Sequence, residues 1–425
     1  MQTDKVYDII GIGIGPFNLG FAALTHDLPE LDTIFIDQQE AFNWHPGLLL
    51  PHARLQVPFY ADLVTAVDPT SKFSFMNYLH EKGRAYQFGI NEQLYPLRIE
   101  YNDYCRWVAS QLPSLQFGYT CHSVHYDELD KTYTVITENT RTRQSKKLRG
   151  KHMVIGTGSK PFLPLNITEN DHPLILHSSN YLKHKSTLLE KARATIIGSG
   201  QSAAEIFHDL LTAPSYQSLH WYSRSDRFHP MDISKLTLEL SSPNYIDHFY
   251  QLTPQIKKEV LISQAYLYKG INQSLLSEIY DQLYQLQLTK TKPLPVLQAN
   301  TELSQLSITD ESIHLQLVHL EKEQKQTIQT DALILATGYT HPQPGFLQPL
   351  GHHINKDLLG RFKISKNYAI NDNQTIFIQN GEQHTHGFNS ADLGLGSHRS
   401  ATIINQILQR DQFSLHNQQL FQSLN

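Results

Sequence analysis

The chain has 425 residues, with 35 basic and 40 acidic side chains and a formal net charge of −5. This charge argues against a nucleic-acid-binding protein, which needs a basic surface, and the lack of an apolar run near about 18 residues argues against a membrane span. Two cysteines, Cys105 and Cys121, are too few and too far apart for a disulfide framework or a CxxC pair, so we expect a soluble, cytoplasmic protein without structural disulfides.

The first predicted element is a strand at residues 6–10, followed by a glycine turn at residues 11–16 and a helix at residues 17–24. Such a turn lets a pyrophosphate approach the backbone, and the following helix N-terminus supplies N–H donors. The next apolar run, residues 33–36, ends at an acid in the position that binds ribose hydroxyls. The predicted FAD contacts of this unit are Gly11, Gly13, Gly15, Pro16 and Asp37, where Pro16 departs from the usual glycine.

A second strand, turn and helix follow at residues 194–197, 198–203 and 203–211. The strand at residues 219–223 ends at Arg224 rather than at an acid. An arginine there suits a 2′-phosphate and favours NADPH over NADH, although a solvated surface arginine is the alternative. The predicted NADPH contacts are Gly198, Gly200, Gln201, Ser202 and Arg224.

Two further apolar strands, residues 153–155 and 332–335, are followed by Gly-Thr-Gly and Ala-Thr-Gly and lie before and after the second unit. The sequence therefore predicts an α/β protein with two Rossmann-like domains. We expect a discontinuous FAD-binding domain at 1–185 and 325–425, and an NADPH-binding domain at 186–324. The leucine- and tyrosine-rich stretch at about 228–295 is expected to form a helical substrate-binding insertion.

Several chemistries are disfavoured by missing motifs. His384 with His386, and His352 with His353, lack the spacing of a metal site, so no metal is expected. The serine motif of hydrolases fails at Ala204, and no vicinal cysteine pair supports disulfide reduction. A reduced flavin without a thiol or a metal can pass electrons to O2, which favours a monooxygenase.

Ordered motifs along nearly the whole chain then resemble one family, the siderophore N-hydroxylating monooxygenases that act on L-lysine N6 or L-ornithine N5. The resemblance rests on residues 43–47 (NWHPG), 55–59 (LQVPF), 62–65 (DLVT), 68–71 (DPTS), 75–79 (FMNYL), 103–104 (DY), 336–339 (ATGY) and 385–387 (THG). It implies FAD and NADPH as cofactors, capture of O2 as a C4a-hydroperoxyflavin, and oxygen transfer to a primary amine. Because tetramers occur among such enzymes, it also implies a homo-oligomer.

The resemblance assigns roles residue by residue. Gln56 matches a glutamine near the flavin ring, and Asn272 matches an asparagine near both the substrate side chain and the nicotinamide ribose; these two are the candidate catalytic residues. The other implied cofactor contacts are Trp44, His45, Thr337, Gly338, Tyr339 and Leu393.

Three positions depart from the amino-acid hydroxylases. Ala61 replaces the lysine that pairs with the substrate α-carboxylate, Leu238 replaces an asparagine before Glu239, and Gly394 replaces a serine. With Asn272, these are the expected substrate positions. A buried carboxylate without a cation costs several kcal/mol, so we expect a carboxylate-free amine: putrescine, cadaverine or histamine.

Three alternatives remain open at this stage. Lys72 or Arg84 could replace the missing cation and restore lysine or ornithine as the substrate. An uncoupled NADPH oxidase would consume O2 without hydroxylating any amine. A non-catalytic binding protein would have degenerate glycine turns, whereas both turns here are intact.

Overall fold

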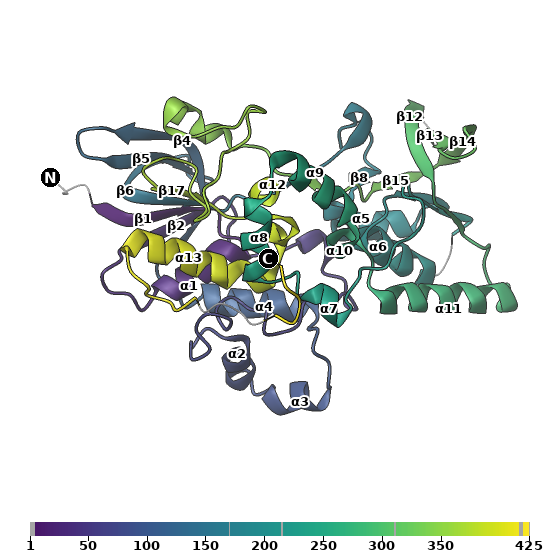
Figure 1. The fold of residues 1–425 in the computed structure, drawn as a ribbon. Coiled ribbons are helices and arrows are strands. Elements are labelled where there is room, and N and C mark those ends of the chain that lie inside the picture. The colour runs from purple at the N-terminus through teal and green to yellow at the C-terminus, as the bar shows by residue number, and fades with distance from the viewer. Residues whose placement is uncertain (1–4, 170, 214–215, 310–311, 416–419, 425) are drawn as a thin grey trace.

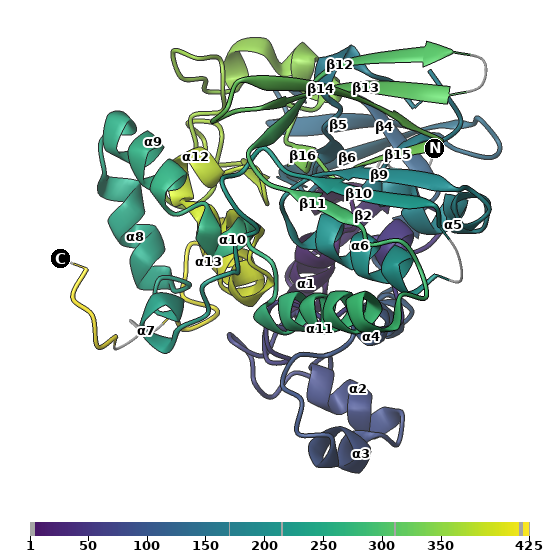
Figure 2. The same cartoon turned by 90° about the vertical axis from the view of Figure 1, so that its right-hand side faces the viewer.

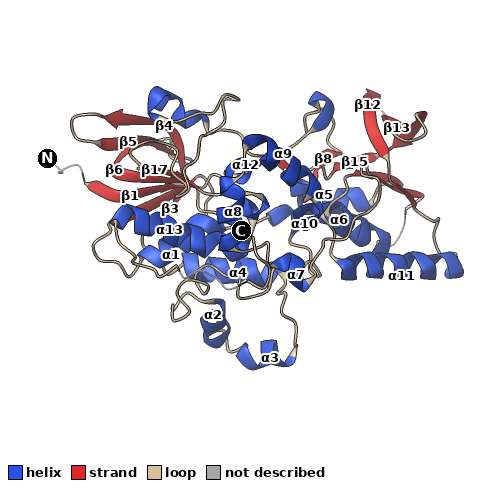
Figure 3. Ribbon diagram, viewed as in Figure 1, coloured by secondary structure: helices blue, strands red, loops and turns tan. Residues whose placement is uncertain are grey.

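The computed structural model describes residues 5–169, 171–213, 216–309, 312–415 and 420–424. Two sheets, one mixed and one parallel, lie side by side, each with helices packed against it (Figure 1). Figure 3 shows the same arrangement as two groups of strands separated by a mainly helical middle.

The first sheet is a parallel core extended by antiparallel strands. Its order is β3-β2-β1-β6-β5-β4, and β17 pairs with the carboxyl end of β6. The apolar run predicted at residues 6–10 is the central strand β1, as expected for a strand covered on both faces. The strands are β1 (Val6–Ile12), β2 (Thr33–Asp37), β3 (Leu115–Phe117), β4 (Tyr119–Asp127), β5 (Thr132–Asn139), β6 (Ser145–Ile155) and β17 (Ile376–Ile378).

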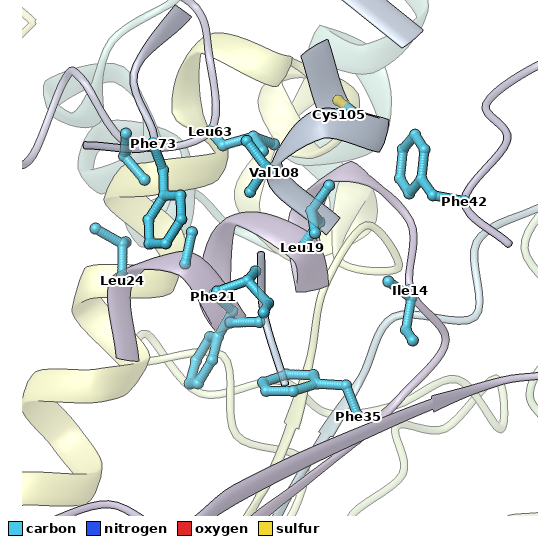
Figure 4. Close-up of a cluster of buried hydrophobic side chains, with 14 of the residues drawn as sticks. Ile14, Leu19, Phe21, Leu24, Phe35, Phe42, Leu63, Phe73, Cys105 and Val108 are labelled. Atoms are coloured by element: carbon cyan, nitrogen blue, oxygen red, sulfur yellow. The ribbon is translucent and has the colours of Figure 1, made fainter. Parts of the chain in front are cut away.

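Three helices cover one face of this sheet: α1 (Pro16–Thr25), α4 (Arg98–Ala109) and α13 (Gly396–Leu408). Leu19 and Phe21 of α1 pack near Phe35 of β2 and Val108 of α4, and all four side chains are fully buried (Figure 4). The alternate residues of β1 and β2 point to the other face, where η4 (Gly345–His353) packs. Helices α2 (Phe75–Glu81) and α3 (Ala85–Ile90) project from the α4 side (Figure 1).

The second sheet is wholly parallel, in the order β11-β10-β9-β15-β8. Helices α5 (Tyr181–Leu189), α6 (Gln201–Thr212) and α11 (Gln273–Thr289) bury their apolar residues on one face, and an antiparallel meander, β12-β13-β14, covers the other. The strands are β8 (Ile175–His177), β9 (Arg193–Ile197), β10 (Ser218–Tyr222), β11 (Val296–Gln298), β12 (Thr301–Thr309), β13 (Ser312–His319), β14 (Gln324–Thr330) and β15 (Ala332–Leu335).

Sheet membership differs from the boundaries expected at 186 and 324. Both β8 and β15 belong to the second sheet, so this layer starts before residue 186 and ends after residue 324. β15 pairs with β9 along its whole length and separates it from β8. The apolar strands 153–155 and 332–335 look alike in sequence, and only their partners decide which sheet each one joins.

The crossing between the two layers is narrow and closely packed. A short ladder joins β7 (Lys160–Pro161) to β16 (Tyr339–Thr340). Nearby, η1 (Pro46–Leu48) packs on η3 (Ser178–Asn180) so tightly that a β-carbon on Gly47 would lie 1.7 Å from the carbonyl oxygen of Ser179. Only a residue without a side chain fits there.

The expected helical insertion divides into two parts. Leu275 and Ile279 of α11 are buried against α6, so this helix belongs to the second layer. Helices α8 (Pro243–Gln251), α9 (Pro254–Ser263) and α10 (Tyr266–Lys269) instead pack around Phe388 beside the C-terminal helices, and the short α7 (Lys235–Leu238) precedes them. Figure 2 shows α8 and α9 beside α12 (Gln383–His386), with α11 below α6.

Candidate active site

The first glycine turn has the shape that a pyrophosphate needs. Gly13 has φ +89°, and a β-carbon there would lie 2.4 Å from the carbonyl oxygen of Gly156 at the end of β6. Among the described residues, no heavy atom beyond its neighbours lies within 4 Å of a β-carbon built on Gly15. Gly15 is the N-cap of α1 and offers no capping side chain, so the first amides of this helix are available to an anion.

Asp37 lies at the end of β2, next to this turn. Its Oδ2 accepts from the amide of Ile14 at 2.7 Å, and its Oδ1 accepts from the amide of Gln39 at 2.7 Å. These two bonds fix the carboxylate beside Gly13 and Gly15, with lone pairs left for ribose hydroxyls. The five residues predicted for the first dinucleotide are thus brought together.

The second turn repeats this geometry on the other sheet. Gly200 is the N-cap of α6, where, within the part of the chain that the structure describes, a β-carbon would meet only the carbonyl oxygen of Lys269 at 3.4 Å. Gln201 and Ser202 form the first turn of α6, and Gly198 is held by a 2.8 Å bond from the indole nitrogen of Trp221. Arg224 follows β10 and is exposed, as a cation for a 2′-phosphate must be.

The candidate catalytic residues meet between the layers. Gln56 Nε2 donates to Asn272 Oδ1 at 3.1 Å, although these residues come from the first layer and from the N-cap of α11. The backbone amide of Asn272 donates to Gln201 Oε1 at 2.8 Å. One hydrogen-bonded chain therefore joins a predicted flavin contact, a predicted substrate contact and the second glycine turn.

Trp44, His45 and Tyr339 form an aromatic group beside that chain. The Trp44 and His45 rings are 4.6 Å apart, and the His45 and Tyr339 rings are 6.3 Å apart. The surrounding protein, with the charge of Arg98, lowers the pKa of His45 to about 4, although the residue is exposed. His45 is therefore a poor candidate for a cation that would pair with a substrate carboxylate.

The segment around Thr337 and Gly338 lies at the connection between the two layers. Gly338 has φ +83°, and its carbonyl accepts from His177 Nε2 at 3.0 Å.

On the first layer, a cavity of about 200 Å³ lies where β6 and β17 end and is lined by residues that include Thr157, Gly158, Asn380 and Gly381. The carboxyl ends of parallel strands are where α/β sheets bind ligands.

Two of the expected substrate positions, Ala61 and Gly394, meet from segments far apart in the sequence. A β-carbon built on Gly394 would lie 3.5 Å from the Ala61 β-carbon and 3.2 Å from Oδ1 of Asp392. Leu238, which is 43% exposed, precedes Ser241 in one turn, and Ser241 N donates to its carbonyl. Leu393, between Asp392 and Gly394, packs against the first core.

Asp392 is the residue that sequence reasoning missed. Its Oδ1 accepts from the amide of Gly394 at 2.8 Å, and the Ser241 hydroxyl also bonds to the carboxylate. Burial raises the pKa of this carboxyl group. Its position two residues before Gly394 was the available signal, but only the fold reveals that this acid lies beside Ala61.

The two cations proposed as alternatives are engaged elsewhere. Lys72 Nζ lies 3.0 Å from Asp27, and Arg84 lies 3.1 Å from Glu100 and covers the ring of Tyr78. Neither contact leads to Ala61 or Gly394.

The histidine pairs have different environments. His384 Nε2 and His386 Nε2 bond to the backbone carbonyls of Phe362 and Lys366, at 2.9 and 3.2 Å. The ligand atoms of His352, His353 and Glu128 lie within 4.8 Å of one another, but two of these residues are exposed. Neither pair touches the hydrogen-bonded chain described above.

The structure contains no helix, within its described residues, that is long and apolar enough to cross a membrane.

The chain resembles a putrescine N-hydroxylase of Shewanella oneidensis with 42% identity over 95% of this chain and 81% of the relative. A putrescine N-hydroxylase of Acinetobacter baumannii is 41% identical over 99% of this chain and 94% of its own length. Among solved structures, the FAD-bound cadaverine monooxygenase DfoA of Erwinia amylovora superposes with a TM-score of 0.95 and 39% identity, covering 98% of each chain.

The family model described as L-lysine 6-monooxygenase/L-ornithine 5-monooxygenase matches residues 5–341. This match and the relatives confirm the α/β fold, the enzyme class and the cofactor pair expected from the sequence. The chain therefore belongs to the lysine/ornithine monooxygenase family of flavin-dependent N-hydroxylating enzymes, which use FAD and NADPH.

Proposed function

We propose that this enzyme hydroxylates one amino group of an aliphatic diamine, putrescine or cadaverine, for the assembly of a hydroxamate siderophore. The observation that carries the proposal is the carboxylate of Asp392 beside Ala61 and Gly394. Relatives that share about two fifths of the sequence are named for these same two diamines.

The charge at this end of the site supports a cationic substrate. Asp392 is bonded by the Gly394 amide and the Ser241 hydroxyl, both neutral donors, and the cation that acts on it, Arg399, is already paired with Glu382 at 3.0 Å. A distal ammonium would supply a further cation through a charge-assisted hydrogen bond. The α-carboxylate of lysine or ornithine would instead meet a like charge, which adds repulsion to the loss of the lysine at Ala61.

The residues of the two layers have complementary proposed roles. The first glycine turn with Asp37 would hold FAD, and the second turn with Arg224 would hold NADPH. Reduced FAD would supply the oxygen chemistry, while Gln56 and Asn272 would orient the reacting amine beside it. Desolvation there would favour the neutral amine, which is the form with a lone pair to react, although a free alkylamine has a pKa of about 10.4.

The test is amine-dependent hydroxylamine formation with NADPH and added FAD. Putrescine, cadaverine, histamine, lysine and ornithine are compared with wild type and with Asp392→Asn. We expect product from the aliphatic diamines, and a KM at least about tenfold higher in Asp392→Asn because a neutral amide attracts an ammonium weakly.

Each other outcome points to a different function. Product from lysine or ornithine alone would overturn the diamine proposal. Preference for histamine would mean that the end of the pocket accepts an imidazole. NADPH and O2 consumption without product from any amine would favour an oxidase.

A further inference from the structure

A buried ion pair joins the two layers directly beneath the candidate site. Glu205, in the second turn of α6, has a side chain only 1% exposed, and its Oε2 lies 2.8 Å from Nη1 of Arg98, which is 12% exposed. Arg98 is the first residue of α4 in the first layer. Ion pairs buried to this degree add little stability compared with apolar residues of the same size, so their position calls for another explanation.

The second oxygen of Glu205 leads to the site. Glu205 Oε1 accepts from Gln201 Nε2 at 2.8 Å, and Gln201 Oε1 accepts from the amide of Asn272 at 2.8 Å. Asn272 Oδ1 in turn accepts from Gln56 Nε2 at 3.1 Å. Five residues therefore form one relay from the guanidinium of Arg98 to the carboxamide of Gln56, which passes through the backbone amide and then the side chain of Asn272.

The direction of this relay follows from hydrogen-bond chemistry. An ionised carboxylate only accepts, so Glu205 fixes the nitrogen of the Gln201 carboxamide toward itself. The oxygen of Gln201 must then face away, toward the amide of Asn272. With a partner that can also donate, the Gln201 carboxamide could rotate and lose the bond to Asn272.

We propose that Glu205, held by Arg98, is a positioning residue that sets the Gln201 carboxamide and thereby places Asn272 between the amine and the nicotinamide. This inference rests on the role proposed above for Asn272, but it does not depend on which amine is the substrate. Arg98 contributes by neutralising Glu205 and by tying α6 to the first layer, so that Gln56 and Asn272 keep their register.

The experiment separates positioning from stability with three variants. Arg98→Met with Glu205→Leu replaces the ion pair by apolar side chains, so the fold should persist with a Tm within about 3 °C of wild type. Gln201→Leu removes the next member of the relay and leaves the pair intact. Asp209→Asn is the matched control, because Asp209 lies one turn further along α6 and pairs with Lys185 at 2.8 Å outside the relay.

Three quantities are measured for each variant: the NADP+ dissociation constant of FAD-free protein, the anaerobic rate of flavin reduction by NADPH, and hydroxylamine formed per NADPH oxidised. We expect the double variant, Arg98→Met with Glu205→Leu, to form about tenfold less hydroxylamine per NADPH. The reason is that a small misplacement of groups at a reacting centre lowers the rate steeply. Gln201→Leu should show a similar loss, and combining it with the double variant should add nothing. The control should match wild type in all three measurements.

If the variant with Arg98→Met and Glu205→Leu is stable and forms as much hydroxylamine per NADPH as wild type, the proposal is overturned. The ion pair would then be a purely structural contact. Losses that multiply in the combined variant would also overturn the proposal, because they would show two separate effects. Failure of the proposed function would look different: wild type itself would form no hydroxylamine, while the reduction rate and NADP+ affinity would still report on the relay.

Discussion

The dinucleotide turns and the amine end of the site are built in different ways. Each turn uses a contiguous run of backbone, such as Gly13 and Gly15 before α1 or Gly200 before α6. The amine end instead gathers Ala61, Asp392 and Gly394 from segments far apart in the sequence. Backbone geometry suits a ligand that a whole family can share, whereas a side-chain replacement can change the preferred ligand without changing the fold.

The largest effect should come from breaking the first turn. Gly13→Ala would put a β-carbon 2.4 Å from the Gly156 carbonyl at a residue with φ +89°, so we expect a Tm lower by several degrees and loss of FAD binding. Gly200→Ala is the matched change, since its β-carbon would meet only a contact at 3.4 Å. It should keep the Tm and weaken only NADPH binding. Equal Tm losses in calorimetry would contradict this contrast.

A second prediction concerns a variant that adds a positive charge beside Asp392. Ala61→Lys would place an ammonium within reach of Asp392, where it would take the position proposed for the distal ammonium of the substrate. We expect kcat/KM for the diamine to fall about a hundredfold, since removal of a charge partner costs a few kcal/mol. Ala61→Met has similar length without charge and should cost much less. If both variants lose the same activity, steric crowding rather than charge would be the cause.

A third prediction concerns the strand end of the second turn. Arg224→Gln removes the cation proposed for the 2′-phosphate, so KM for NADPH should rise about tenfold while KM for NADH stays unchanged. Arg227→Gln is the control, because Arg227 is exposed nearby and pairs with Asp226. An equal rise for NADPH and NADH would mean that Arg224 does not read the phosphate.

The smallest expected effect is a pH dependence. Burial raises the pKa of Asp392, so its carboxylate takes up a proton at a higher pH than an ordinary aspartate does. Protonation removes the charge that would attract the distal ammonium, and KM for the diamine should therefore rise a few-fold as the pH is lowered from neutral. Asp392→Asn cannot titrate and should show a flat KM over this range. A parallel rise in both proteins would assign the effect to another group.

The sequence supported most of the nucleotide-binding half of the site. Glycine spacing, a preceding apolar run and the residue at the next strand end all lie within short segments, and the structure has a glycine turn before α1 and before α6 as expected, while the ligands of these turns stay a prediction. The sheet that each strand joins was not readable in the same way, because the strands 153–155 and 332–335 have the same local pattern, while pairing with β1 or β9 decides their sheet. The homo-oligomer stays a prediction.

By itself, the sequence determined the two βαβ units, the family and the loss of a cation at Ala61, because these depend on local periodicity and on residue identity at a matched position. Only the tertiary structure decided that Asp392 and Ala61 lie around Gly394, and that Glu205 is linked to Asn272 through Gln201. Hydrogen bonds and charges act over a few ångströms, and residues hundreds of positions apart come that close only once both sheets have folded and packed together.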